Sequence, residues 1–68
     1  SGYINIDCRT IGEPLYYQIY GITGVQVGSG RLNGNTVNHL QLTGLEHGIY
    51  IIHLKTNKGL YYGKFVKQ

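Results

Sequence analysis

The sequence has no Ala, Met or Trp, a single Cys and a single Pro, and only nine residues of Asp, Glu, Lys or Arg. Its three carboxylates, Asp7, Glu13 and Glu46, stand on separate segments, and this spacing offers no acid and base pair. Cys8 has no partner for an internal disulfide, and the alternating apolar stretch around it predicts a buried thiol. We therefore expect no catalytic residues and no enzyme activity.

Other scarcities exclude further classes of protein. His39, His47 and His53 each stand alone, so neither a metal site nor a cofactor site is predicted. The net charge of +3 comes from dispersed basic residues, unlike the dense basic stripe of a nucleic-acid-binding protein. No apolar run is long enough to span a membrane. No signal peptide is expected, because a strand-like pattern follows Ser1-Gly2, a dipeptide that could be a cloning remnant.

The sequence is rich in Ile, Leu, Val, Tyr and Gly, which suits short strands joined by tight turns. Its 68 residues suffice for one domain with a thin core. Alternating apolar and polar residues predict about seven strands, at residues 3–8, 15–20, 25–27, 31–32, 36–42, 49–55 and 60–66. The predicted fold is all-β, an immunoglobulin-like sandwich of two antiparallel sheets, with a small closed barrel as the alternative.

Glycine-rich segments predict where the chain turns. Residues 21–24 (GITG) predict a hairpin turn, and residues 33–35 (NGN) predict a tight turn, because Gly and Asn tolerate left-handed geometry. Residues 28–30 (GSG) predict a kink or bulge that breaks the third strand and lets the chain change sheets. The strand at residues 49–55 is apolar on both faces, which predicts a central position in its sheet.

Three stretches then follow one another in a recognisable order: residues 19–27 (IYGITGVQV), 40–52 (LQLTGLEHGIYII) and 64–68 (KFVKQ). They resemble the motifs VYDxxGrxV, IdLSxLxxGxYxI and KfvK of the type A C-terminal sorting domain of type IX secretion (Por secretion system) in the Bacteroidota. The similarity covers about fifty residues. It departs from the family at Gly21, where Asp or Asn is usual, and at Val25, where a polar side chain is usual, so a charged contact by this loop is not expected.

The resemblance implies a single sorting domain over residues 1–68 that directs an attached cargo protein through the outer-membrane translocon to the cell surface. It implies three partners: the translocon, its outer-membrane shuttle protein, and a sortase-like peptidase that usually removes the domain and joins the cargo to anionic lipopolysaccharide. The domain is expected in the periplasm in transit and then at the outer membrane or cell surface.

Two alternatives remain open at this point. One is a retained accessory β-sandwich of a secretion-system or surface protein that binds anionic lipopolysaccharide or glycan. The other is a structural spacer or dimerisation module that pairs through an edge strand.

The candidate site residues fall into three groups. Partner recognition is predicted for Lys64, Phe65, Val66, Lys67 and Gln68. A terminal edge strand offers unpaired backbone groups to a partner, and lysines in water beside a buried Phe would attract an anionic rim. The motif positions Gly24, Leu45, Gly48 and Tyr50 are expected to shape the turns and to fill the end of the core.

The third group consists of Tyr16 and Tyr62, which are candidates for glycan contact because exposed aromatic rings stack on sugars. Packing between neighbouring strands would explain the same residues equally well.

Overall fold

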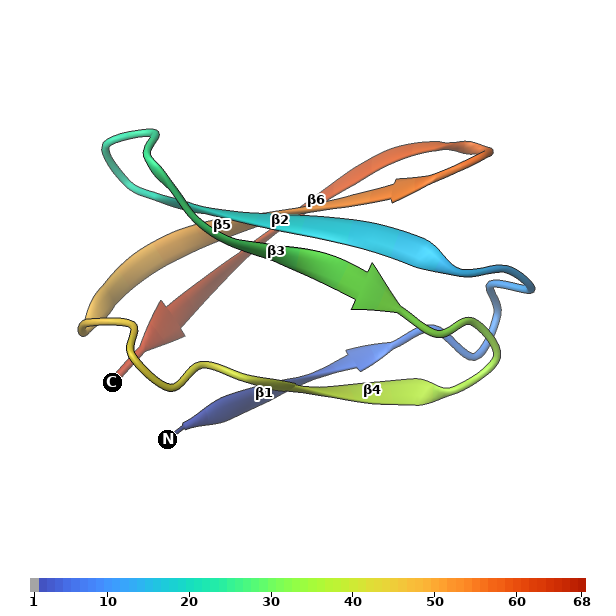
Figure 1. Cartoon of the computed structure of the whole chain (residues 1–68), viewed down its shortest axis with the longest axis horizontal. Helices are drawn as coiled ribbons and strands as arrows, with labels where there is room; N and C mark the ends of the chain where they lie inside the picture. Colours follow the sequence, from blue (N-terminus) through green and yellow to red (C-terminus); the bar gives the residue numbers. More distant parts are fainter. Residues whose placement is uncertain (1) are drawn as a thin grey trace.

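The computed structural model describes residues 2–68, which form six antiparallel strands in two sheets (Figure 1). The strands are β1 (Tyr3–Asp7), β2 (Leu15–Gly21), β3 (Gln26–Leu32), β4 (Val37–Gln41), β5 (Gly48–Thr56) and β6 (Gly59–Lys67). The larger sheet has the order β3-β2-β5-β6, and β1 pairs with β4 in the smaller sheet. The predicted all-β sandwich is confirmed, with six strands in place of about seven.

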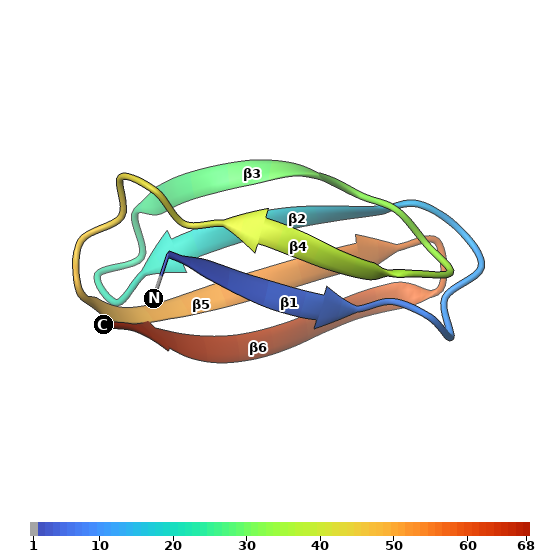
Figure 2. The ribbon, with the colours of Figure 1, turned by 90° about the horizontal axis from the view of Figure 1, so that it is seen from below.

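The smaller sheet lies across one face of the larger sheet, as Figure 2 shows from below. In that view β4 and β1 cover the middle of the larger sheet, whereas β3 and β6 form its flanks. This arrangement leaves much of β6 exposed, and only Phe65 and Lys67 in this strand are half-buried. The larger sheet therefore has an inner face, directed at β1 and β4, and an outer face that no described residue covers.

Buried side chains form two clusters between the sheets. The first cluster consists of Ile19, Leu42, Tyr50 and Ile52. The second consists of Cys8, Leu15 and Leu32. Tyr17, Ile6 and Leu54 pack against both clusters and join them into one core. The thiol of Cys8 is fully buried, as predicted from the alternation around it.

The predicted break of the third strand at residues 28–30 is wrong, because β3 runs through all three residues. Gly30 pairs with Tyr17, and a Cβ on Gly30 would lie 2.8 Å from the Tyr17 ring. This glycine leaves room for an aromatic ring on the inner face and does not interrupt the strand. A bulge does occur one step away: Ile19 pairs with Gly28 and Tyr20 with Gln26, so the residue between them has no partner.

The chain changes sheets after Leu32 instead, through the predicted turn at residues 33–35. Asn35 has a φ of 60°, and its N–H lies 2.9 Å from the Cys8 carbonyl and 2.7 Å from the Ile11 carbonyl. A Cβ on Gly34 would lie 2.4 Å from the backbone oxygen of Glu13. The β3–β4 turn therefore packs directly against the β1–β2 loop, and Gly34 is required for that close approach.

Two other expectations are confirmed. Residues 21–24 form the turn between β2 and β3: the Gly24 N–H donates to the Gly21 carbonyl, and the Gly21 N–H donates to the Val25 carbonyl, both at 2.9 Å. Strand β5 is central, because it pairs with β2 on one side and β6 on the other.

Candidate functional site

The three motif stretches meet at one end of the sandwich, which we call the motif end. The β2–β3 turn, the β4–β5 connection, the start of β1 and the end of β6 lie there together (Figure 1). Gly21 and Phe65 both pair with Tyr50, one from each side of β5. The stretches at residues 19–27, 40–52 and 64–68, well separated in the sequence, are thus brought side by side at this end of the fold.

Tyr50 is the residue that joins these stretches. Its ring is buried and stacks on Phe65, with 5.4 Å between ring centroids and 20° between ring planes. Its hydroxyl donates a hydrogen bond of 2.6 Å to the Glu46 carbonyl. One side chain thus contacts both the β4–β5 connection and β6.

Lys67 provides a second tie between the same two segments. Its Nζ donates a hydrogen bond of 2.8 Å to the Leu45 carbonyl, and the side chain is half-buried. Leu45 itself packs against the core cluster that contains Leu42 and Tyr50. The expectation that both terminal lysines lie free in water is therefore wrong for Lys67, whereas Lys64 is exposed.

Gly24 and Gly48 adopt conformations that side-chain-bearing L-residues rarely adopt, with φ values of 90° and 154°. Nothing lies within 4 Å of a Cβ added to Gly24, and the nearest atom to one on Gly48 is in the Tyr50 ring at 4.0 Å. Substitution would thus cost backbone strain and not steric overlap, roughly 1–3 kcal/mol at each position.

Strand β6 is an edge strand with its free side turned away from β5. Gly21 bonds to β3 through its N–H, so along β2 the even-numbered residues turn their backbone groups toward β5. Tyr50 on β5 pairs with Gly21, so it turns its backbone groups away from β2 and toward β6. Phe65 pairs with Tyr50 and therefore turns its own N–H toward β5. The N–H groups of Lys64 and Val66 then point outward from the free edge, where an added strand could accept their hydrogen bonds.

The structure places Tyr16 and Tyr62 on the outer face, 58% and 66% exposed. They belong to different rows of that face. Tyr62 meets the His53 ring edge-on at 4.6 Å between centroids, and His53 contacts Tyr20 at 4.7 Å. Tyr16 instead pairs across the sheet with Lys55. Both residues lie outside the stretches that build the motif end.

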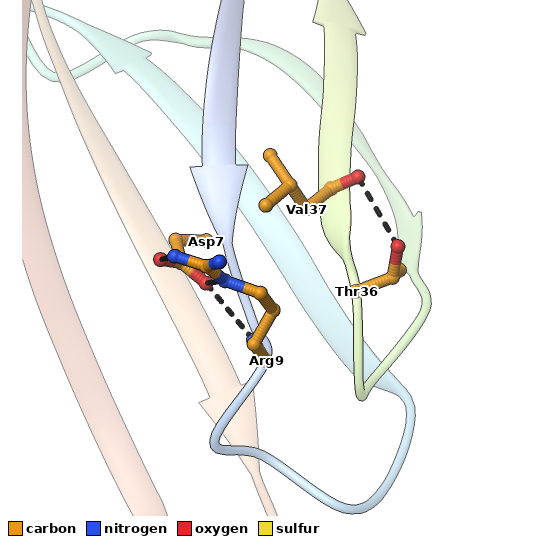
Figure 3. Close-up of polar contacts among 4 residues, drawn as sticks. All are labelled: Asp7, Arg9, Thr36 and Val37. Atoms are coloured by element: carbon orange, nitrogen blue, oxygen red, sulfur yellow. Dashed lines mark hydrogen bonds and ion pairs between the residues drawn. The ribbon is translucent and has the colours of Figure 1, made fainter.

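An ion pair at the opposite end of the molecule was not anticipated from the sequence. The Arg9 Nη2 and Asp7 Oδ2 atoms lie 2.8 Å apart, and the backbone N–H and Nε of Arg9 each lie 3.0 Å from Asp7 Oδ1 (Figure 3). These hydrogen bonds, and the guanidinium charge, lower the pKa of Asp7 to about 2. An acid and an Arg two residues apart at a strand end could have indicated the pair. Both side chains are exposed, and the pair is separate from the motif end.

Within residues 2–68, no three His, Cys, Asp or Glu side chains gather closely enough to hold a metal ion. The same part of the chain contains no helix long and apolar enough to cross a membrane. The shared motifs form a surface at one end of a small core. Fold and site together define a small immunoglobulin-like β-sandwich domain.

The family to which this domain belongs follows from comparison with known proteins. The family model described as "Secretion system C-terminal sorting domain" matches residues 1–68, and the chain belongs to this family of type IX sorting domains. No curated protein and no solved structure matches it significantly. Membership makes the chain a C-terminal sorting signal for type IX secretion, which interacts with the secretion system and accompanies export to the cell surface or outer membrane.

Proposed function

We propose that the outer-membrane translocon and its shuttle protein recognise the motif end of this domain as a folded surface. The domain reaches them from the periplasm, and a sortase-like peptidase then removes it and joins the cargo to anionic lipopolysaccharide. In this scheme the domain contributes no catalytic group and is a substrate of the peptidase. The observation that supports the proposal is that all three family motifs meet at one end of the fold.

The terminal strand supports docking in two ways. Its free edge directs the N–H groups of Lys64 and Val66 to solvent, and a partner strand can pair with such an edge. The Val66 side chain is 56% exposed on the outer face, next to Ile49 across the sheet. Backbone pairing would supply affinity, while the Lys64 charge and the apolar neighbours would supply selectivity.

The contacts that hold β6 support recognition of the folded domain over recognition of a linear peptide. The Phe65–Tyr50 stack and the Lys67–Leu45 hydrogen bond tie this strand to residues fifteen and twenty-two positions earlier in the chain. An extended peptide of the same residues would lack these contacts and would also lose conformational entropy on binding, so it would bind more weakly.

The test is export of a periplasmic reporter fused to residues 1–68 in a host with a working type IX system. The complete fusion should reach the cell surface, and a fusion that ends at Gly63 should remain in the periplasm. Export of the shortened fusion at the normal level would contradict recognition through the terminal strand. Incubation of the purified fusion without host extract should give no cleavage, because the domain supplies no peptidase chemistry.

A further inference from the structure

One row of the outer face places an aromatic ring between two cations. Tyr16 on β2 pairs directly with Arg31 on β3 and with Lys55 on β5. Side chains directly opposite each other on neighbouring strands have Cβ atoms about 4.5–5.5 Å apart. All three side chains are exposed and point away from the core. Tyr16 is the second residue of β2 and Lys55 the last but one of β5, so the row lies beside the β1–β2 loop and the β5–β6 turn, at the other end of the sandwich from the motif end.

The surface is hollowed at this row. A cavity of about 480 Å³ is lined by Tyr16, Tyr17, Gln18, Ser29, Gly30, Arg31 and Lys55. Its polar lining contains hydroxyl, amide, guanidinium and ammonium groups and no carboxylate. Lys55 also lines two adjoining cavities, and one of them is lined by Tyr16 and Glu13 as well. The first cavity is therefore the one that is lined by both cations and by no carboxylate.

The two cations have no acidic partner in the described part of the chain. The single ion pair there joins Arg9 to Asp7, at the end of another strand. A guanidinium binds carboxylate or phosphate through two parallel hydrogen bonds, and an ammonium adds a second point charge. The Tyr16 ring lies between them and offers an apolar face, while Gln18 and Ser29 add hydrogen-bonding groups suited to hydroxyls.

We propose that this cavity binds an acidic sugar, a hexose bearing a carboxylate or phosphate within a polysaccharide. The anionic group would lie between Arg31 and Lys55, and the apolar face of the ring would stack on Tyr16. A second copy of this chain is disfavoured as the occupant, because it would bring the same uncompensated cations face to face. The inference does not rest on docking at the motif end, since a different set of residues carries it.

The test is a titration followed by amide NMR shifts of the uniformly ¹⁵N-labelled domain. Trigalacturonate should shift the amides of Ser29, Arg31 and Lys55 in a saturable way. Its neutral methyl ester should bind at least tenfold more weakly, which isolates the contribution of the carboxylates. Inorganic phosphate alone should also bind at least tenfold more weakly, because it has no face to stack on Tyr16.

Matched variants separate this cavity from general positive charge. Arg31→Gln combined with Lys55→Gln should weaken trigalacturonate binding at least tenfold. Lys64→Gln combined with Lys67→Gln removes the same charge at the motif end and should change it less than twofold. Tyr16→Ser should weaken binding at least fivefold, and urea unfolding of each variant checks that the fold persists.

Four results would overturn the proposal: no saturable shift, shifts centred on another surface, equal binding of the ester, or equal losses in the two double variants. Self-association that grows with protein concentration and perturbs the same amides without ligand would assign the face to a second copy instead.

Discussion

Phe65 and Tyr50 stack at 5.4 Å between ring centroids, and this contact joins the last strand of the chain to the central strand β5. The Tyr50 hydroxyl extends the contact to Glu46. The final residues are therefore part of the sandwich. Their position is tied to the segment before Gly48 by the hydrogen bonds from Tyr50 to Glu46 and from Lys67 to Leu45.

Loss of the Phe65 ring should destabilise the domain measurably. Phe65→Ala removes a half-buried ring from the motif end, and we expect the free energy of unfolding to fall by about 2 kcal/mol, below the 3–5 typical of a fully buried Phe. Val66→Ala, on the exposed face, should change it by less than about 0.5 kcal/mol. Urea denaturation followed by circular dichroism measures both. Equal effects of the two substitutions would mean that the stack does not hold β6.

The two terminal lysines should differ in their contribution to stability. Lys67→Met deletes the hydrogen bond to the Leu45 carbonyl, and a loss of about 1 kcal/mol is expected. Lys64→Met serves as the matched control, because the Lys64 side chain is exposed. The same urea experiment applies to both. A Lys67 variant as stable as the Lys64 variant would show that the contact contributes nothing in solution.

Gly34 should be among the least replaceable residues of the chain. A Cβ there would lie 2.4 Å from the Glu13 carbonyl oxygen and 2.5 Å from that of Ile11, so backbone must move. Gly34→Ala is expected to cost about 3 kcal/mol, at the upper end for overpacking. Gly12→Ala meets nothing within 4 Å and should be close to neutral. Thermal unfolding of the pair would refute the prediction if both melted at the same temperature.

The Asp7–Arg9 pair makes a prediction about pH. The pKa of Asp7 is lowered from 3.8 to about 2, mainly by the side-chain hydrogen bond from Arg9. Because the folded value is the lower one, the stabilisation is present above about pH 4 and is lost as the pH falls through about 2. NMR titration of the Asp7 carboxyl should give that low pKa, and Arg9→Gln should return it toward 3.8. An unchanged pKa in the variant would contradict the pairing.

The alternation of side chains allowed most of the fold to be predicted. Ile4 and Ile6 in β1, and Leu15, Tyr17 and Ile19 in β2, point inward as their period-two spacing indicates. Turn chemistry at residues 21–24 and 33–35 was also informative. These signals are local, since each depends on the conformation of a few neighbouring residues.

What could not be predicted depends on contacts between strands. Gly30 looks like a strand breaker until the Tyr17 ring opposite it is known, and Gly34 looks like an ordinary turn glycine until the β1–β2 loop is packed against it. The tie from Lys67 to Leu45 and the row formed by Arg31, Tyr16 and Lys55 likewise require the strand register. Sequence spacing alone does not give that register.

The central claim, that a partner pairs with the free edge of β6 at the motif end, is tested most directly by two proline substitutions. The N–H groups of Val66 and Leu60 both point to the free edge, so proline at either position spares the bonds to β5. Export of the reporter fusion should fall to background with Val66→Pro and stay near normal with Leu60→Pro, while both purified domains melt cooperatively. Normal export of a folded Val66→Pro fusion would contradict the claim.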